Sequence, residues 1–417
     1  MEEIMLYRKM KKNDDELSIL GYGCMRLPQK KGSPGDGKID EKRATTQIRM
    51  AIDEGVNYID TAFPYHMGNS EPFLSRALSN GYRTKVKLAT KLPRWIVKEK
   101  GEMDTILNSQ LNRLKTDQID YYLIHALDDK SWQTMEAMGV CEFLSRAKTD
   151  GRIANAGFSF HGDRKSFNAI VDAYDWDFCQ IQYNFLDQQN QAGTKGLKYA
   201  ASKELGVIVM EPLRGGLLAR QPPPEIKKLW DEAEEKRTPA EWSLRWIWNH
   251  PEVTVVLSGM NDESHIRENL RSSETGTPNS LSDSELNLIG RIEEKYRSLM
   301  KAGCTGCHYC MPCPNGVDIP TCFEAFNHSH MYGDEKWAKL FYISRVAIGE
   351  NPGRSSQCEK CGECEEVCPQ KLPIQQLLED VTAEMEGHFF DTKVWVFNKF
   401  FNFKRWQTLR TEKKLIR

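Results

Sequence analysis

The sequence predicts an α/β protein that begins with a closed barrel of eight parallel strands and crossover helices, a (β/α)8 TIM barrel. A small cysteine-rich domain is expected to follow the barrel. Two observations predict this architecture. Short apolar runs alternate with amphipathic helical segments from Leu17 to about Leu270, as they do in consecutive βα units. Nine of the twelve cysteines then fall between Cys304 and Cys368.

Composition limits the class of protein and its partners. The chain has 417 residues, a net charge of −2 and 28% charged residues, which argues against nucleic acid or an anionic membrane surface as a partner. The segment from Met1 to Glu16 is charged, and no uninterrupted apolar run is long enough to span a bilayer. We therefore expect a cytoplasmic protein whose clustered cysteines bind metal rather than form disulfides.

The predicted elements follow one another in βα order. The first strand covers Leu17–Gly23, a Pro/Gly-rich loop follows as far as Gly37, and Gly55 ends a helix over Glu41–Glu54. The other predicted strands are Val56–Asp60, Val86–Lys91, Ile119–His125, Arg152–Gly157, Phe178–Tyr183, Val207–Met210 and Val253–Leu257. The other predicted helices are Glu71–Ser79, Met103–Leu114, Trp132–Thr149, Arg164–Tyr174, Lys195–Leu205 and Pro239–Trp248, and Phe323–Ile348 also has a helical pattern.

An open, doubly wound sheet is the competing architecture for such an alternation. That fold usually carries a glycine-rich phosphate-binding turn between its first strand and first helix. Here Gly21-Tyr22-Gly23 is followed by Cys24-Met25-Arg26, with neither a third glycine nor a helix. The sequence therefore favours the closed barrel.

Polar side chains stand where the predicted strands end. Asp60 ends the second strand and Tyr65 follows it, Lys91 ends the third and His125 ends the fourth. Ser159 follows the fifth strand, and Gln180 lies in the sixth. Alone, each has a plain structural explanation, such as a strand cap, a surface lysine or a core histidine. Because reactive groups of such barrels gather at the carboxyl ends of the strands, their recurrence predicts a proton-transfer site there.

The segments Asp60-Thr61-Ala62-x-x-Tyr65, Lys91 and Tyr122-Leu123-Ile124-His125 resemble those of the aldo-keto reductases, (β/α)8 barrels that reduce carbonyls with NAD(P)H. The resemblance covers about Leu17 to Leu270. It implies that Tyr65 is the general acid, that Lys91 lowers the pKa of Tyr65, and that Asp60 holds Lys91 in place. It also implies that His125 orients the substrate carbonyl by a hydrogen bond.

The same resemblance implies a cofactor site. Ser159 and Gln180 fall where the family binds the nicotinamide carboxamide, and Glu268 and Asn269 match its adenine-side pattern. Met210 stands where many members have an aromatic residue that stacks on the nicotinamide. Gly259 and His265 occupy places where many members carry the Lys and Arg that bind the 2′-phosphate of NADP. NAD(P)H and flavin both stay open as cofactors.

Two cysteine runs predict metal centres in the second domain. The first is Cys304-x2-Cys307-x2-Cys310-x2-Cys313-Pro314, and the second is Cys358-x2-Cys361-x2-Cys364-x3-Cys368-Pro369. The second run has the bacterial ferredoxin spacing, in which three cysteines bind one [4Fe–4S] cubane and the fourth reaches the other. Two four-cysteine runs, each followed by proline, favour two such clusters over a pair of all-thiolate zinc sites. Cys322 fits no ligand spacing and is expected to be a buried apolar residue, with a replacement ligand as the alternative.

The chain as a whole is similar to a bacterial and archaeal subfamily of aldo-keto reductases that carries a C-terminal ferredoxin-like domain. The predicted organisation is a barrel over residues 1–300, a ferredoxin-like iron–sulfur domain over 301–375 and an aromatic, basic tail over 376–417. The stretch from Phe389 to Arg417 is either a strap on the protein's own surface or an interface with a subunit or partner.

The predicted function combines the two domains. Carbonyl reduction moves two electrons together, whereas each cubane moves one. We therefore expect an iron–sulfur oxidoreductase that interconverts a small carbonyl compound and an alcohol and exchanges electrons with an external carrier. The alternatives are an NAD(P)H-dependent reductase with structural clusters and a non-catalytic electron-transfer module. The sequence leaves homo-oligomerisation open.

Overall fold

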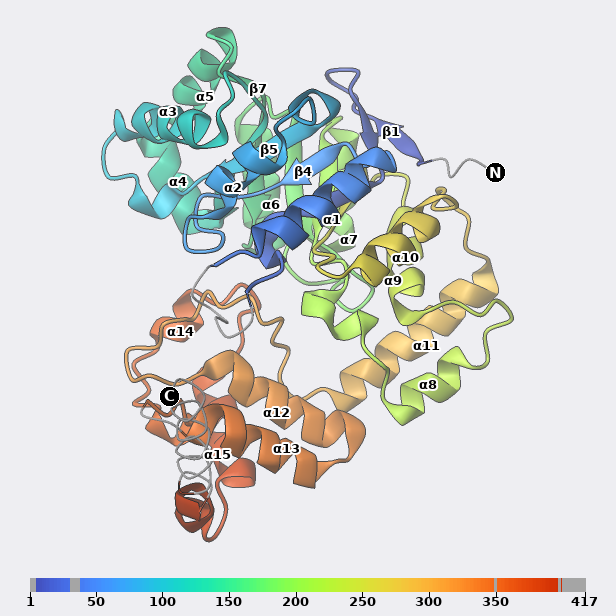
Figure 1. Cartoon of the computed structure of the whole chain (residues 1–417), viewed down its shortest axis with the longest axis vertical. Helices are drawn as coiled ribbons and strands as arrows, with labels where there is room; N and C mark the ends of the chain where they lie inside the picture. Colours follow the sequence, from blue (N-terminus) through green and yellow to red (C-terminus); the bar gives the residue numbers. More distant parts are fainter. Residues whose placement is uncertain (1–4, 31–37, 349–350, 397–398, 400–417) are drawn as a thin grey trace, which may run out of the picture. The chain divides into compact units, whose positions relative to one another are not determined.

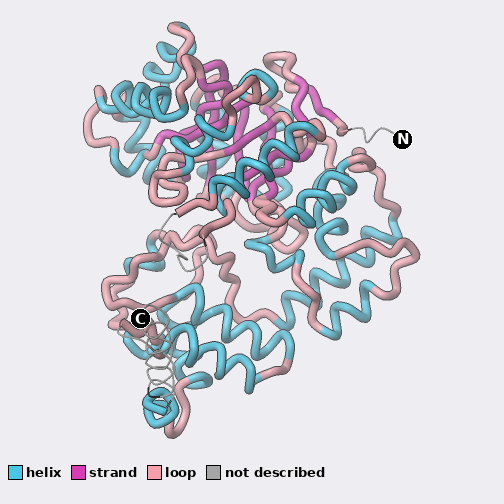
Figure 2. The backbone as a smooth tube through the Cα atoms, viewed as in Figure 1, coloured by secondary structure: helices cyan, strands magenta, loops and turns pink. Residues whose placement is uncertain are grey.

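The computed structural model describes residues 5–30, 38–348, 351–396 and 399. The chain divides into two compact units, one made of Met1–Gln221 and Ala233–Gly290 and the other of Pro222–Glu232 and Arg291–Arg417. Each unit is described by itself. In Figure 2 the described strands gather in unit 1, and the described part of unit 2 consists of helices and loops.

Unit 1 contains the predicted closed barrel. Its eight strands pair in the order β10-β3-β4-β5-β6-β7-β8-β9, and every pairing within the barrel is parallel. The barrel strands are β3 (Leu20–Gly23), β4 (Tyr58–Asp60), β5 (Lys87–Leu92), β6 (Ile119–Leu127), β7 (Ile153–Phe160), β8 (Phe178–Gln182), β9 (Gly206–Met210) and β10 (Val255–Ser258). All eight predicted strands are thus present, which confirms the fold class.

Helices surround the strands in Figure 1. The helices of unit 1 are α1 (Glu41–Asp53), α2 (Ser70–Ala77), α3 (Glu102–Leu114), α4 (Asp129–Ala137), α5 (Val140–Thr149), α6 (Arg164–Ala173), α7 (Gly193–Ser202), α9 (Pro239–Trp248) and α10 (Glu263–Ser273). Several begin at the acid or threonine that the sequence supplies. Asp163, for example, accepts a hydrogen bond from Ser166 N at 2.8 Å before α6, and Thr238 caps α9 in the same way.

The first predicted strand, Leu17–Gly23, is in fact two elements. β2 (Glu16–Ser18) pairs antiparallel with β1 (Tyr7–Lys9), and only β3 enters the barrel. This hairpin places Met10 and Leu17 in one buried cluster with the barrel residues Tyr58, Tyr121 and Phe178. The sequence shows one unbroken apolar run across β2 and β3 because Leu17 of β2 also packs into the barrel core.

The predicted helix Trp132–Thr149 is also two elements, α4 and α5. Gly139 has φ 76°, a left-handed conformation that interrupts the helical hydrogen bonding after Met138. The helical pattern over Phe323–Ile348 divides in the same way at Gly333, where φ is 66°. In both cases the apolar periodicity of the sequence continues across a glycine at which the helix ends.

Unit 2 is helical and has its own buried core. Its helices are α8 (Pro224–Trp230), the part of α11 (Asp283–Leu299) from residue 291, α12 (Ile319–Tyr332), α13 (Glu335–Tyr342), α14 (Glu363–Glu366) and α15 (Ile374–Met385). The core includes Phe323 and Tyr342, together with Val381, Phe390 and Val394 from the predicted tail over 376–417. Residues 397–398 and 400–417 of that tail lie outside the described residues.

None of the helices in the described ranges combines the length and the apolar character that crossing a lipid bilayer requires.

Candidate active site and cysteine cavities

Asp60 and Lys91 form a buried charge pair at the ends of neighbouring strands. β4 pairs with β5, and Lys91 Nζ lies 2.7 and 2.9 Å from the two carboxylate oxygens of Asp60. The ammonium also donates to the main-chain oxygen of Thr61 at 2.8 Å, and Gln180 Nε2 donates to Asp60 at 3.0 Å. Asp60 and Lys91 are 3% and 1% exposed, so the pair is held without bulk water.

Tyr65 lies next to this pair. Lys91 Nζ is 3.5 Å from the phenol oxygen and 5.0 Å from the ring centre of Tyr65. Burial raises the pKa of Tyr65 well above its usual value, and the nearby Asp60 carboxylate adds to the rise. The expectation that Lys91 lowers the pKa of this tyrosine stays a prediction. The Lys91 ammonium lies closer to the Asp60 carboxylate, at 2.7 Å, than to the phenol oxygen, at 3.5 Å.

His125 completes the group of four side chains that the sequence predicted. Its ring centre is 6.2 Å from that of Tyr65, with the two rings edge to face, and 5.1 Å from that of Trp95. Burial lowers the pKa of His125 well below its usual value, and the positive charge of Lys91 lowers it further. The imidazole is therefore neutral near pH 7, and its Nδ1 has no hydrogen-bond partner among the described residues. Trp95 was not singled out from the sequence.

Ser159 lies within β7, not after the strand as predicted. Its Oγ accepts a hydrogen bond from Ala126 N at 2.7 Å, where the pairing of β6 with β7 shifts register. Ala126 has φ 56°, so its N–H turns away from the regular ladder and the serine hydroxyl takes the place of a main-chain acceptor. Sequence periodicity carries no signal for such a bulge.

The other predicted cofactor residues occupy two places in unit 1. Met210 ends β9 and packs against the barrel core. On α10, Asn269 is buried and donates to Ser258 Oγ at 2.9 Å, while Glu268 accepts a hydrogen bond from Thr238. Gly259 is exposed in the loop between β10 and α10, and His265 is exposed on α10.

A buried network behind Lys91 was missed at the level of sequence. Glu71, which is fully buried on α2, accepts hydrogen bonds of 2.7 Å from Thr90, Gln110 and Arg113. Gln110 also donates to the main-chain oxygen of Lys91 at 3.0 Å. The network fixes the backbone at Lys91. It leaves no local pattern in the sequence, because its members come from three separate elements, α2, β5 and α3.

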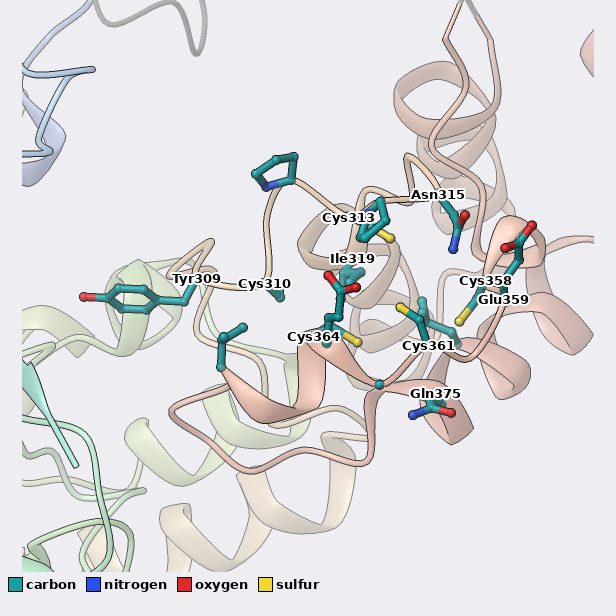
Figure 3. A pocket seen from close by; sticks show the side chains of 16 residues that line it. Tyr309, Cys310, Cys313, Asn315, Ile319, Cys358, Glu359, Cys361, Cys364 and Gln375 are labelled. Carbon is teal, nitrogen blue, oxygen red and sulfur yellow. The ribbon is translucent and has the colours of Figure 1, made fainter. Parts of the chain in front are cut away.

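Unit 2 contains a cavity of about 150 Å³ among cysteines of both runs. Figure 3 shows the sulfur atoms of Cys313, Cys358, Cys361 and Cys364 around a common space. Burial raises the pKa of Cys364 to about 11, with further contributions from Cys358, Cys313 and Cys361. Cys358, Cys361 and Cys364 of the second run and Cys313, the last cysteine of the first run, thus surround one cavity.

A second, smaller cavity of about 20 Å³ is lined by Cys304, Cys307, Cys310 and Cys368. Burial raises the pKa of Cys310 to about 12, and Cys304, Cys307 and Cys368 add to the rise. Cys310 also touches the larger cavity. Each cavity is thus lined by three cysteines of one run and by the fourth cysteine of the other, the arrangement that the ferredoxin spacing predicts.

The two cysteine runs have matching backbones. Left-handed residues recur at equivalent positions, with φ of 65° at Gly306 and 57° at Lys360, and of 63° at His308 and 86° at Gly362. Cys322 lines neither cavity. It is fully buried and donates to the main-chain oxygen of Gly353 at 3.6 Å.

Two family models match this chain. Residues 19–294 match the description "Aldo/keto reductase family", and residues 303–372 match "4Fe-4S dicluster domain". An uncharacterized oxidoreductase of Bacillus subtilis, YqkF, is 25% identical over 298 residues, covering 64% of this chain and 90% of that protein. The NADH-specific methylglyoxal reductase of Escherichia coli is 26% identical over 326 residues, covering 67% of this chain and 96% of that protein.

The comparison with solved structures agrees. The apo form of aldo-keto reductase AKR11C1 from Bacillus halodurans is 27% identical, with a TM-score of 0.55, and the match covers 69% of this chain and 96% of that one. Together, the two matched family models define an oxidoreductase of the aldo/keto reductase type with a C-terminal 4Fe–4S dicluster domain. More particularly, the chain belongs to the aldo/keto reductase family, whose model matches more than half of its residues.

Proposed function

We propose that this protein interconverts a small carbonyl compound and its alcohol at Asp60, Tyr65, Lys91 and His125, and exchanges electrons with an external carrier through two [4Fe–4S] clusters. The observation that carries the proposal is the buried Lys91 ammonium, which contacts both the Asp60 carboxylate and the Tyr65 phenol. A lysine held in that way supports proton transfer by the phenol without itself reaching solvent.

Tyr65 acts as the acid in the reducing direction. Because its pKa is raised, the phenol keeps its proton at neutral pH and can give it to the oxygen of the carbonyl as that oxygen gains charge. Lys91, 3.5 Å away, then faces the phenolate and stabilises it. Asp60 holds the ammonium in place throughout.

His125 positions the substrate. A neutral imidazole can donate one N–H to the carbonyl oxygen, and the His125 ring centre lies 6.2 Å from that of the proposed acid, Tyr65. Trp95 beside His125 supplies an apolar wall for the rest of the substrate. Bound NAD(P)H would supply a hydride, for which Ser159, Gln180, Met210, Glu268 and Asn269 are the proposed binding residues.

The two cavities of unit 2 fit the clusters by their donor chemistry. Each brings together four thiols, the ligand set of a [4Fe–4S] cubane: Cys304, Cys307, Cys310 and Cys368 for one, and Cys313, Cys358, Cys361 and Cys364 for the other. When bound, each cluster supplies one-electron transfer. Two clusters together hold two electrons, the number that a hydride carrier bound in the barrel transfers when a carbonyl and an alcohol are interconverted.

Replacement of Tyr65 by Phe tests the proposed chemistry. The variant should lose about 100-fold or more of its carbonyl turnover, measured anaerobically with a reduced carrier, while its iron and sulfide contents stay unchanged. Tyr199→Phe is the matched control, since the Tyr199 hydroxyl bonds to the exposed Asp172 far from the site in sequence. Wild-type turnover in Tyr65→Phe would contradict the assignment of the acid.

An ordinary NAD(P)H-dependent reductase with structural clusters is the second candidate. The similarity to an NADH-specific methylglyoxal reductase favours it. Cys361→Ser separates the two, because it weakens one cluster without touching the barrel. Unchanged turnover with NADH in a folded, iron-depleted variant would support the second candidate, whereas turnover lost together with the cluster supports electron exchange through it. The non-catalytic module is disfavoured by the assembled Asp60–Lys91–Tyr65 group.

A further inference from the structure

Thr305 carries a buried hydroxyl for which the described residues supply no partner. The side chain is 5% exposed, and its Oγ1 has no hydrogen-bond partner in the part of the chain that the structure describes. A buried hydroxyl left unpaired costs about 1–3 kcal/mol. Thr305 lies between Cys304 and Cys307 and lines the smaller cysteine cavity together with them. The position of this hydroxyl therefore points to an acceptor inside that cavity.

The lining of the smaller cavity supplies few competing acceptors. Apart from the four cysteines and Thr305, its polar lining residues are His308 and Gln370, and neither of them forms a hydrogen bond with the Thr305 hydroxyl. The remaining lining is apolar: Ile319, Pro320, Phe323, Pro369, Leu372 and Ile374. In such surroundings a hydrogen bond to a charged sulfur is stronger than it would be in water. A cubane bound by the four cysteines would supply such acceptors for the Thr305 hydroxyl, namely the sulfur atoms of the cluster and of its thiolate ligands.

The other cysteine loop lacks such a donor at the same position. Glu359 follows Cys358 as Thr305 follows Cys304, and the matching left-handed residues Gly306 and Lys360 show that the two loops turn alike. Glu359 is exposed, and so is Cys361 in its loop. The two cavities thus present different surroundings to chemically identical clusters.

We propose that the hydroxyl of Thr305 donates a hydrogen bond to a sulfur of the cluster held by Cys304, Cys307, Cys310 and Cys368, and so raises the reduction potential of that cluster alone. The inference rests on the cluster ligands assigned under the proposed function. Reduction adds one electron to the cluster and increases the negative charge on its sulfurs. A donor to those sulfurs stabilises the reduced form more than the oxidised form, so the potential rises.

A redox titration of the anaerobically purified full-length protein, followed by electron paramagnetic resonance, tests this role. Thr305→Val replaces the hydroxyl by a methyl group of similar size, and Thr305→Ser keeps the hydroxyl. We expect one of the two reduction steps to move to a more negative potential in Thr305→Val and to return towards its wild-type value in Thr305→Ser. The Cys361→Ser variant, which alters the other cluster, identifies the step that should not move.

Thr382→Val is the matched control for loss of a threonine hydroxyl in unit 2. The Thr382 hydroxyl bonds to Leu378 O at 2.8 Å and to Ser355 Oγ at 2.9 Å, and Thr382 lines neither cavity. Both reduction steps should keep their potentials in this variant. If Thr305→Val loses iron, Thr305→Ala and Thr305→Ser carry the same comparison.

Two results would overturn the inference. One is a pair of unchanged potentials in Thr305→Val together with a higher melting temperature, the result expected if the hydroxyl is merely an unpaired group. The other is an equal shift of both steps, which indicates a general loss of structure. A wild-type protein without iron, or with a single reduction step, would instead contradict the cluster assignment on which the inference rests.

Discussion

At the scale of single residues, Asp60 and Lys91 show how this site keeps charge inside a barrel. Two opposite charges that are almost fully buried cost desolvation energy, and only their mutual attraction and further hydrogen bonds offset it. Here Lys91 Nζ has three acceptors within 2.9 Å, and Asp60 has a second donor in Gln180. Each charge is satisfied only while its partner is present.

Removal of one charge should therefore cost more than removal of both. Asp60→Asn leaves the Lys91 ammonium buried without a counter-ion, and Lys91→Met leaves the Asp60 carboxylate with Gln180 alone. We expect each change to lower the free energy of unfolding by about 3–5 kcal/mol. The double variant should lose clearly less than the sum. Urea unfolding of the four proteins gives the coupling energy, and strictly additive losses would show that the pair does not act as a unit.

At the scale of secondary structure, the junction of β6 and β7 links packing to the site. The register changes between Ile124 and Leu127, so the strand gains a residue just after His125. The freed N–H of Ala126 is satisfied by Ser159 Oγ and not by a main-chain oxygen. A serine hydroxyl thus fixes the bulge that directly follows His125.

Ser159→Ala should disturb this junction. The buried Ala126 N–H would lose its acceptor, which costs about 1–3 kcal/mol of unfolding free energy. We expect faster hydrogen exchange in the β6 peptide that contains Ala126, and lower carbonyl turnover because His125 is less well held. Ser145→Ala is the matched control, since its exposed hydroxyl forms a hydrogen bond of 2.9 Å with the Tyr174 hydroxyl. Equal exchange in Ser159→Ala and wild type would remove this role from the serine.

The elements also show which parts of the site could be predicted. A short apolar run that ends in a polar residue is enough to place Asp60 and Lys91, because parallel strands end at the same edge of the barrel. Pairings that depend on the three-dimensional path carry no local signal. The buried ion pair of Asp187 with Arg214, at 3.1 Å, joins the loops after β8 and β9, and neither residue stands out in the sequence.

At the scale of the whole molecule, the alternation of strands and helices and the cysteine spacing predicted both the barrel and the second domain. They did not predict that Pro222–Glu232 packs with the second unit, where Glu225 pairs with Lys295 at 2.7 Å and Glu232 with Arg291 at 2.7 Å. Surface ion pairs of this kind leave no periodicity in the sequence. The difference in exposure between Thr305, which is buried, and Glu359, which is exposed, could not be predicted either, because both residues stand at the same place in matching cysteine runs.

Four buried or half-buried histidines predict how the stability of unit 1 responds to acid. Burial is the largest cause that lowers the pKa of His66, His125, His161 and His250, and it brings the pKa of His161 to about 4. Below pH 6.5 the unfolded chain binds protons at these positions more readily than the folded barrel does. The unfolded state is then favoured, so stability falls as the pH falls from 6.5 towards 4.

Hydrogen exchange of the barrel-strand peptides, corrected for the intrinsic effect of pH, measures this loss in unit 1 separately from the acid lability of the clusters. His161 alone should contribute at most about 2 kcal/mol of the loss at pH 5, since each unit of pKa depression is worth about 1.4 kcal/mol. His161→Gln, which does not titrate, should show a shallower dependence on pH than wild type. Stability that stays constant or rises between pH 6.5 and 5 would mean that the four imidazoles accept protons in the folded barrel. The neutral His125 that we propose as the donor to the carbonyl would then be lost as well.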